Sequence, residues 1–288
     1  MFDRKNASLA LELVTFSHTL FVLPIIFSGY IISLKEFNIA IFILILIAAI
    51  SARTIGMLFN RIIDSNLDLQ NPRTSQRLIP TGKVSKKFVT SFLILSLIVF
   101  FVSSWLICDL VLFLAPILLI CFFIYPYLKR VTWFCHFFLG ITLSLGPLAG
   151  GIVASCSLDS VPLTFPIAIF TVFWVSGFDI LYALQDVDSD IRDGTYSIPS
   201  YFGKKIAIVI SAICFFISSL SFLYYILHTS SIHISASNSI NNLLFMILIV
   251  GFWIQITRSK KDDFSFFKYN SYVGFLILIL IISDILLR

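Results

Sequence analysis

The chain alternates long apolar runs with short polar segments. A helix needs about 17 to 25 mainly apolar residues to cross the hydrocarbon core of a bilayer. Nine runs of roughly this length lie at 13–34, 38–59, 87–107, 110–128, 132–154, 163–185, 205–228, 240–257 and 270–287. The pattern predicts an all-α fold: a polytopic membrane protein with about nine transmembrane helices in one bundle, forming a single domain over residues 1–288.

Composition agrees with this class. Of the 288 residues, 59% are hydrophobic and 12% are charged, whereas a soluble domain carries about 25% charged residues. The five cysteines are an odd number without a Cys-x-x-Cys pair, so we expect free cysteines and neither a disulfide framework nor a zinc site. The histidines are scattered, and His18 and His136 are expected to pack between helices. The first apolar run lacks a cleavage signature and is expected to be retained.

The basic residues predict the orientation. Nine spans place the N-terminus and every second loop on one side of the membrane. Eighteen of the 20 Lys and Arg residues then fall on that side, counting helix-end residues such as Arg53, and only Lys35 and Arg288 fall on the other. Because Lys and Arg are enriched in cytoplasmic loops, this side is predicted to be cytoplasmic.

Two acidic clusters end apolar runs on the predicted cytoplasmic side. Asn60, Asp64 and Asp68 are spaced four apart, so on a helix they project from one face. Asp179, Asp186 and Asp190 also share a helical face. Either cluster alone could be a solvated helix end, but acidic groups at membrane helix ends are costly unless they face a cation, a partner or a polar cavity. Together they predict a metal-dependent site, and oxygen ligands favour magnesium.

Basic side chains accompany both clusters. Arg73 and Arg77 follow the first cluster, and Lys129 and Arg130 end the fourth apolar run. Carboxylates beside Arg and Lys suggest a metal-bridged diphosphate, with the metal on some oxygens and the cations on the others. A diphosphate bound at the mouth of a membrane cavity most naturally carries a lipid tail. Lys129 and Arg130 could instead be topology anchors.

With these motifs in this order, the chain resembles the UbiA superfamily of intramembrane aromatic prenyltransferases. Asn60, Asp64 and Asp68 match its Asn-x-x-x-Asp-x-x-x-Asp signature, and the loop from Arg73 through Arg77 to Gly82 is similar to its basic loop. The segment from Tyr125 to Thr132 and the second acidic cluster, from Asp179 through Tyr182-Ala183 to Ser197, match in order along the chain. The chain departs from the pattern at Arg61, where many members have Asp, and at Leu78-Ile79.

The resemblance implies a cavity open to the cytoplasmic side, an inner-membrane location in a bacterium, and a Mg²⁺-dependent transferase. The enzyme would move a polyprenyl group from polyprenyl diphosphate to a ring carbon of a small aromatic acid, 4-hydroxybenzoate in quinone biosynthesis. No nucleic acid or obligate protein partner is implied. The implied metal and diphosphate constellation is Asn60, Asp64, Asp68, Asp186 and Asp190. Further diphosphate or acceptor contacts would be Arg73, Arg77, Lys129, Arg130, Asp179 and Tyr182.

Other functions stay open from the sequence. The same chemistry on a dihydroxynaphthoate, in menaquinone biosynthesis, would use the same motifs, because they bind the shared diphosphate. Membrane carboxylates also bind coupling ions in transporters, although arginines beside them fit a diphosphate better. A CDP-alcohol phosphotransferase also uses spaced membrane aspartates, but its Asp-Gly-x-x-Ala-Arg lead-in is absent from the sequence. Tail length is not encoded in the motifs.

Overall fold

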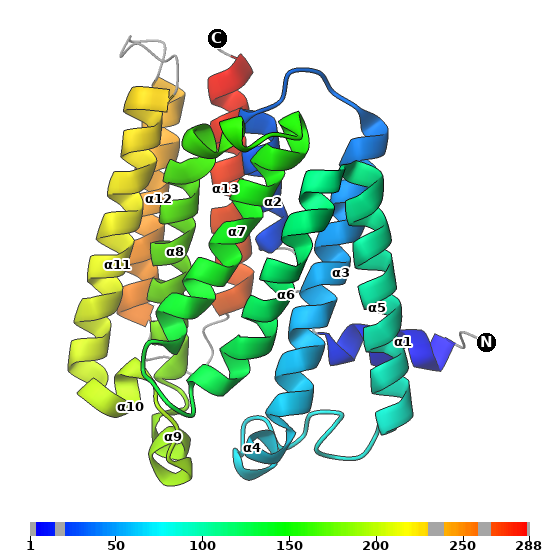
Figure 1. Cartoon of the computed structure of the whole chain (residues 1–288). Coiled ribbons are helices and arrows are strands. Elements are labelled where there is room, and N and C mark those ends of the chain that lie inside the picture. The colour runs from blue at the N-terminus through cyan, green and yellow to red at the C-terminus, as the bar shows by residue number, and fades with distance from the viewer. Residues whose placement is uncertain (1–3, 15–20, 230–238, 259–265, 287–288) are drawn as a thin grey trace.

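The computed structural model describes residues 4–14, 21–229, 239–258 and 266–286, and these contain helices but no strands (Figure 1). The predicted all-α class is confirmed. The helices are α1 (Arg4–Leu13), α2 (Val22–Ile32), α3 (Ile39–Ile63), α4 (Ser65–Gln70), α5 (Lys86–Ile107), α6 (Asp109–Leu128), α7 (Cys135–Ser155), η2 (Leu158–Ser160), α8 (Val161–Ala183), α9 (Val187–Asp193), α10 (Ile198–Phe202), α11 (Lys204–Tyr224), η3 (Tyr225–Thr229), α12 (Ser239–Arg258) and α13 (Phe266–Leu286).

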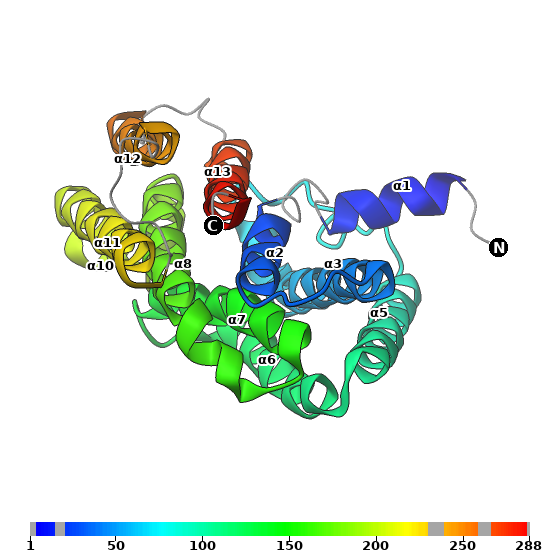
Figure 2. The ribbon, with the colours of Figure 1, turned by 90° about the horizontal axis from the view of Figure 1, so that it is seen from above.

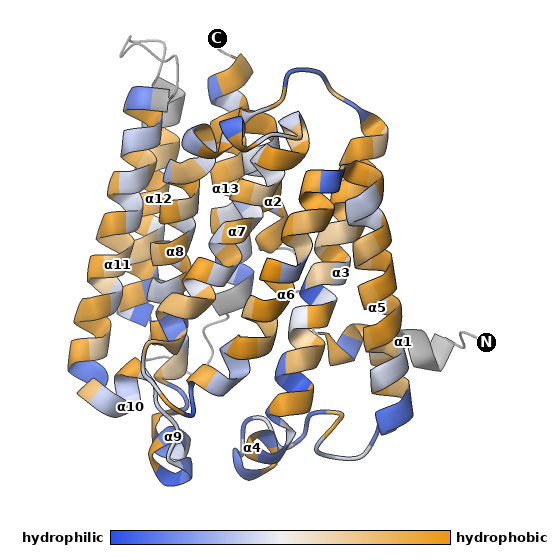
Figure 3. Cartoon of the chain, in the orientation of Figure 1, coloured by the Kyte–Doolittle hydropathy of each residue, from blue (hydrophilic) through white to orange (hydrophobic). Residues whose placement is uncertain are grey.

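Seven of the described helices are long and apolar enough to cross a membrane. They overlap seven of the nine predicted spans: Ile39–Ile63, Lys86–Ile107, Asp109–Leu128, Cys135–Ser155, Leu158–Ala183, Lys204–His228 and Lys268–Leu286. Two shorter apolar helices, Val22–Ile32 and Leu243–Arg258, fall in the first and eighth predicted spans. Apolar colour covers the long helices, and polar colour gathers at the end of the bundle that carries α4 and α9 (Figure 3). The chain is an integral membrane protein, and the exact count of nine crossings stays a prediction.

The long helices form an arc with a second layer inside it. Seen from above, α8, α7, α6 and α5 follow a curve, and α2 and α3 lie on its inner side (Figure 2). α7 packs on α8 and α2, and α3 packs on α5 and α6. The short helices α4, α9 and α10 lie at one end of this bundle, beyond the ends of α3 and α8 (Figure 1).

Glycines let α2 and α7 approach closely. A methyl group built on Gly29 would lie 1.9 Å from the carbonyl oxygen of Pro147, and one on Gly150 would lie 2.1 Å from that of Ile26. Because membrane helices associate largely through close packing, small residues at these crossings hold the inner layer against the arc.

An apolar cavity of about 340 Å³ lies between the two layers. Residues of α2, α3, α5, α6, α7 and α8 line it, and nearly all of them are aliphatic or aromatic, such as Ile45, Phe100 and Phe122. Arg53 of α3 is the one charged residue among the lining residues. The bundle therefore encloses a space suited to a hydrocarbon group, with a single cationic side chain in its wall.

The expectation of five free cysteines is wrong for two of them. Cys108, in the tight turn between α5 and α6, forms a disulfide with Cys156, which ends α7. Their Cα atoms lie 6.4 Å apart. The sequence pattern concealed the bond because the two residues are 48 positions apart and become neighbours only when α5 and α7 end at the same face. Cys121, Cys135 and Cys214 are free, as predicted.

This disulfide gives a test of the predicted orientation. It lies at the bundle end opposite Asp64, and disulfides persist in oxidising compartments rather than in the cytoplasm. We therefore expect a membrane-impermeant maleimide to label Cys156 in intact cells once Cys108→Ser has released it. As a control, Lys87→Cys is introduced into a protein in which both Cys108 and Cys156 are replaced by serine, and this cysteine should be labelled only after permeabilisation. The reverse pattern would invert the predicted topology.

Candidate active site

The first acidic motif spans a helix break. α3 ends at Ile63, and Asp64 serves both as its C-cap and as the N-cap of α4, which carries Asp68. Helical spacing continues through the break, because the Asp64 amide donates to Asn60 O at 2.9 Å and the Asp68 amide donates to Asp64 O at 2.8 Å. Asp64 is 1% exposed and Asp68 is 5% exposed. The predicted shared face is therefore present, with both carboxylates buried.

The second acidic motif is also broken, and the break removes Asp179 from it. α8 ends at Ala183, a turn follows, and Asp186 begins α9, which carries Asp190. Asp179 lies inside α8 and accepts from His136 Nδ1 at 2.7 Å. The predicted common face of Asp179 with Asp186 and Asp190 is not formed, because it assumed one continuous helix across residues 184–186.

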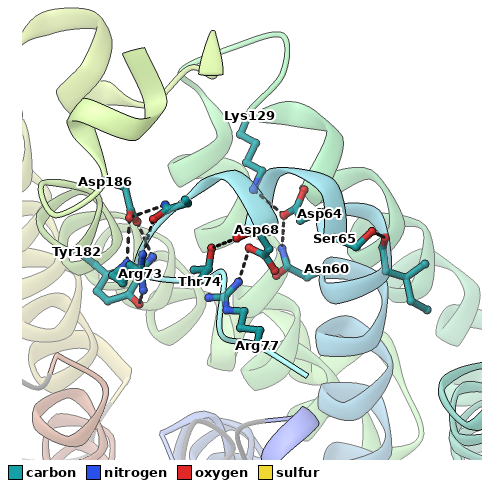
Figure 4. A network of polar contacts seen from close by, with 12 residues as sticks. Asn60, Asp64, Ser65, Asp68, Arg73, Thr74, Arg77, Lys129, Tyr182 and Asp186 are labelled. Carbon is teal, nitrogen blue, oxygen red and sulfur yellow. Dashed lines mark hydrogen bonds and ion pairs between the residues drawn. The ribbon is translucent and has the colours of Figure 1, made fainter. Parts of the chain in front are cut away.

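Each expected phosphate-binding cation contacts an expected metal-binding carboxylate (Figure 4). Arg77 pairs with Asp68 at 2.6 Å and Lys129 pairs with Asp64 at 2.6 Å. Arg130 donates to Asp64 at 3.4 Å and to the backbone oxygen of Ile63 at 2.7 Å, so it also caps α3. Opposite charges far apart in sequence thus meet at one end of the bundle.

Arg73 joins the two motifs. Its guanidinium makes a bidentate contact with Asp186, with Nε–Oδ1 at 2.9 Å and NH2–Oδ2 at 2.6 Å. It also donates to the hydroxyl of Tyr182 and lies over that ring at 4.9 Å from the ring centroid. Asn71 adds a hydrogen bond to Asp186 at 3.0 Å. The loop after the first motif is therefore fixed to the start of the second by hydrogen bonds across 113 residues of sequence.

Burial makes two of the carboxylates costly as anions. It raises the pKa of Asp64, and the Lys129 ammonium opposes this rise only in part. Burial also raises the pKa of Asp190, although the hydroxyls of Ser197 and Thr195 donate to it at 2.7 Å and 3.0 Å. A divalent cation beside these groups would compensate the buried charge and favour the ionised forms.

The expected ligand atoms suit a hard cation that also binds a substrate. All expected ligands are oxygens, and Asp68 Oδ2 is buried without a hydrogen-bond partner in the described part of the chain. Within the same residues, however, no three His, Cys, Asp or Glu side chains gather closely enough to hold one ion. A cation held here would therefore need further oxygen ligands, which a bound diphosphate could supply.

Arg53 is a site residue that the sequence reasoning missed. Counting basic residues treated it as a helix-end anchor, but it lies inside α3, two turns before Asn60 and about 10 Å along the axis. It lines the apolar cavity, and its buried Nε has no hydrogen-bond partner in the described structure. The sequence did contain a signal for this role, because a charged residue inside an apolar run usually has a function.

His136 has the predicted role of a histidine packed between helices. It is buried between helices, as expected, and both of its ring nitrogens have polar partners, Asp179 and the backbone N–H of Ile198. His18 lies outside the described residues. All remaining predicted site residues cluster around the ends of α3, α6 and α8.

A polytopic helical bundle, carboxylates paired with cations, and an apolar cavity are the features expected of a membrane enzyme that acts on an anionic lipid. Residues 21–272 match the model of the UbiA prenyltransferase family. The chain belongs to this family, and it is a transferase.

Individual relatives agree with the family. The chain is 24% identical over 253 residues to the 4-hydroxybenzoate octaprenyltransferase of Vesicomyosocius okutanii, covering 86% of this chain and 89% of that protein. The apo structure of a UbiA homolog from Aeropyrum pernix K1 superposes with a TM-score of 0.82 at 28% identity, over 93% of this chain and 98% of that one. The structure of a UbiA homolog from Archaeoglobus fulgidus bound to GPP and Mg²⁺ has the same fold, with a TM-score of 0.76 at 16% identity over 96% and 99% of the two chains.

Proposed function

We propose that this enzyme transfers a polyprenyl group from polyprenyl diphosphate to a ring carbon of 4-hydroxybenzoate, with Mg²⁺ as its metal. The observation that carries this proposal is the pairing of carboxylates with arginine and lysine at the ends of α3 and α8, together with an apolar cavity whose wall holds Arg53, two turns deeper along α3. The name of the relative from Vesicomyosocius okutanii supports the acceptor.

Substrate binding would exchange partners within the ion pairs. Asn60, Asp64, Asp68, Asp186 and Asp190 would hold Mg²⁺, which when bound supplies positive charge to the departing diphosphate. Arg73, Arg77 and Lys129 would then leave Asp186, Asp68 and Asp64 and contact phosphate oxygens, for which guanidinium groups are well shaped. Neither set of groups is left without a counter-charge, so the exchange avoids the cost of an unpaired buried ion.

The transfer itself breaks one bond and forms another. The C–O bond between the tail and the diphosphate breaks, and its electron pair leaves with the diphosphate. The allylic cation then accepts an electron pair from the acceptor ring carbon beside the phenol hydroxyl, and transfer of that carbon's proton to the released diphosphate restores the aromatic ring. The apolar cavity excludes water that would otherwise capture the cation. Tyr182, once Arg73 turns to phosphate, offers a ring face to the cation.

Arg53 would select an acidic acceptor. A guanidinium in an apolar wall favours a carboxylate, because the pair forms in surroundings that screen charge weakly. Its position two turns deeper than Asn60 would place the acceptor carboxylate in the cavity and the ring towards the diphosphate. A dihydroxynaphthoate also carries a carboxylate, so it is the acceptor to test beside 4-hydroxybenzoate.

The test is an acceptor panel with purified protein. Geranyl diphosphate, Mg²⁺ and either 4-hydroxybenzoate or 1,4-dihydroxy-2-naphthoate are incubated, and products are identified by mass. We expect 4-hydroxybenzoate to gain one prenyl group for each diphosphate released, and we expect chelation of the metal to stop the reaction. Preference for the naphthoate would reassign the acceptor. Flux of labelled substrate into vesicles without any prenylated product would reject the proposal in favour of transport.

A further inference from the structure

His136 connects three helices at the end of the bundle that carries the two acidic motifs. It lies in the first turn of α7 and is 4% exposed. Its Nδ1 lies 2.7 Å from Asp179 Oδ2 of α8, and its Nε2 lies 3.2 Å from the backbone nitrogen of Ile198, the first residue of α10. Both ring nitrogens therefore have a partner, one on α8 and one on α10, so the side chain connects these two helices to α7.

The contacts also define which nitrogen carries the proton. The backbone N–H of Ile198 can only donate, so Nε2 accepts and holds no proton. Nδ1 then carries the proton and donates to Asp179. The carboxylate thus sets the tautomer and ring orientation, and the ring presents a fixed acceptor to the N-terminus of α10.

The N-terminus of α10 in turn holds Asp190. Ser197 caps α10, with a reciprocal bond to Ser200, and the Ser197 hydroxyl donates to Asp190 Oδ2 at 2.7 Å. Ser197 is the residue directly before Ile198, so the hydroxyl on Asp190 and the amide on His136 belong to neighbouring residues. A five-residue helix is not stable by itself, and its position depends on such tertiary contacts.

Two more hydrogen bonds connect the same segment to the end of α6 and to the start of α7. The Tyr196 amide donates to the backbone oxygen of Lys129 at 2.6 Å, and the Cys135 thiol lies 3.5 Å from Tyr196 O. Lys129 is the residue that pairs with Asp64. The contacts of residues 195–198 therefore set the second acidic motif in register with the first.

We propose that His136 is a positioning residue that holds α10, and through Ser197 the carboxylate of Asp190, in place for the metal. The proposal rests on the proposed function, since it assigns Asp190 to the metal. Asp179 belongs to the same arrangement: it orients His136 and lies outside the metal ligands.

The test compares two substitutions of nearly equal shape. His136→Gln keeps one donor and one acceptor, while His136→Met fills the same space without either. The purified proteins are titrated with Mg²⁺ in the presence of geranyl thiolodiphosphate, an analogue that resists ionisation, and the rise in the thermal unfolding temperature is followed. We expect His136→Met to raise the half-saturating Mg²⁺ concentration about 10- to 100-fold, as loss of a group supporting a metal ligand does. His136→Gln should stay close to wild type.

Ser211→Ala is the matched structural control. It removes a buried hydrogen bond from α11 to Gly177 O of α8, at 2.7 Å, without touching α10. It should lower the unfolding temperature of the free protein and leave the Mg²⁺ titration unchanged. If His136→Met does not fold, Ser197→Ala must reproduce the higher Mg²⁺ requirement.

Equal titrations for the two His136 variants, or an unchanged one for Ser197→Ala, would overturn the proposal. Absence of any Mg²⁺ effect in the wild-type protein would reject the proposed metal site instead, and this inference with it.

Discussion

Asp190→Asn is expected to lower kcat by more than about 100-fold while leaving the protein at least as stable as the wild type. The loss of activity follows from removing a charged metal ligand at the diphosphate. Stability should not fall, because Asp190 has no ion-pair partner among the described residues and keeps its place through hydroxyl contacts with Ser197 and Thr195. An amide can satisfy both hydroxyls, since each hydroxyl can donate or accept.

The direction of the pKa shift predicts the gain in stability. Burial raises the pKa of Asp190, so folding disfavours its charged form, and a neutral side chain removes that cost near neutral pH. Thermal unfolding and steady-state kinetics check the two halves of the prediction. Asp188→Asn, an exposed change in the same helix, is the control and should alter neither. A parallel fall of stability and activity in Asp190→Asn would assign Asp190 to the fold rather than to the metal.

Asp64→Asn would be a less clear experiment. The Asp64 side chain is 2% exposed and pairs with Lys129 and Arg130. Removing one partner of a buried ion pair costs about 3–5 kcal/mol, a large part of the stability of a typical protein. Loss of activity there would combine chemistry with folding, whereas Asp190 separates them.

The sequence predicted what depends on local spacing. Asn60, Asp64 and Asp68 keep their one-turn separation even across the end of α3, because backbone hydrogen bonds of the helical type continue through Asp64. The lengths of the apolar runs predicted most of the long helices, because a segment in the bilayer must form its backbone hydrogen bonds internally. The motifs that resemble the family lie together at one end of the bundle.

What depends on tertiary contacts was not predictable from spacing. Asp179 was placed on one helical face with Asp186 and Asp190 because nothing in the sequence signals the turn at 184–186, and its hydrogen-bond partner, His136, is 43 residues away. The pairing of Arg73 with Asp186 and the disulfide of Cys108 likewise require the helices to be packed first. Arg53 was assigned to the membrane surface because a count of basic residues ignores how deep each one lies.

Arg53→Met is expected to raise the KM for 4-hydroxybenzoate about 100-fold and to leave the KM for the prenyl diphosphate near wild type. Losing one partner of a buried, hydrogen-bonded charge pair costs about 2–5 kcal/mol, and each 1.4 kcal/mol is about tenfold in affinity. Methionine preserves the apolar wall formed with residues such as Ala49 and Phe122. The measurement is steady-state kinetics with each substrate varied in turn.

A neutral acceptor separates charge from packing in this experiment. The wild type should disfavour 4-hydroxybenzamide, which lacks the carboxylate, and Arg53→Met should lose most of that discrimination because the acid no longer gains from the pair. Arg53→Lys should be intermediate, since an ammonium keeps the charge but lacks the planar fork that matches a carboxylate. Ser104→Ala, a change elsewhere in the cavity wall, should preserve the preference for the acid. If Arg53→Met weakened both acceptors equally, the guanidinium would be a packing element of α3, and a rise confined to the diphosphate KM would move it to the leaving group.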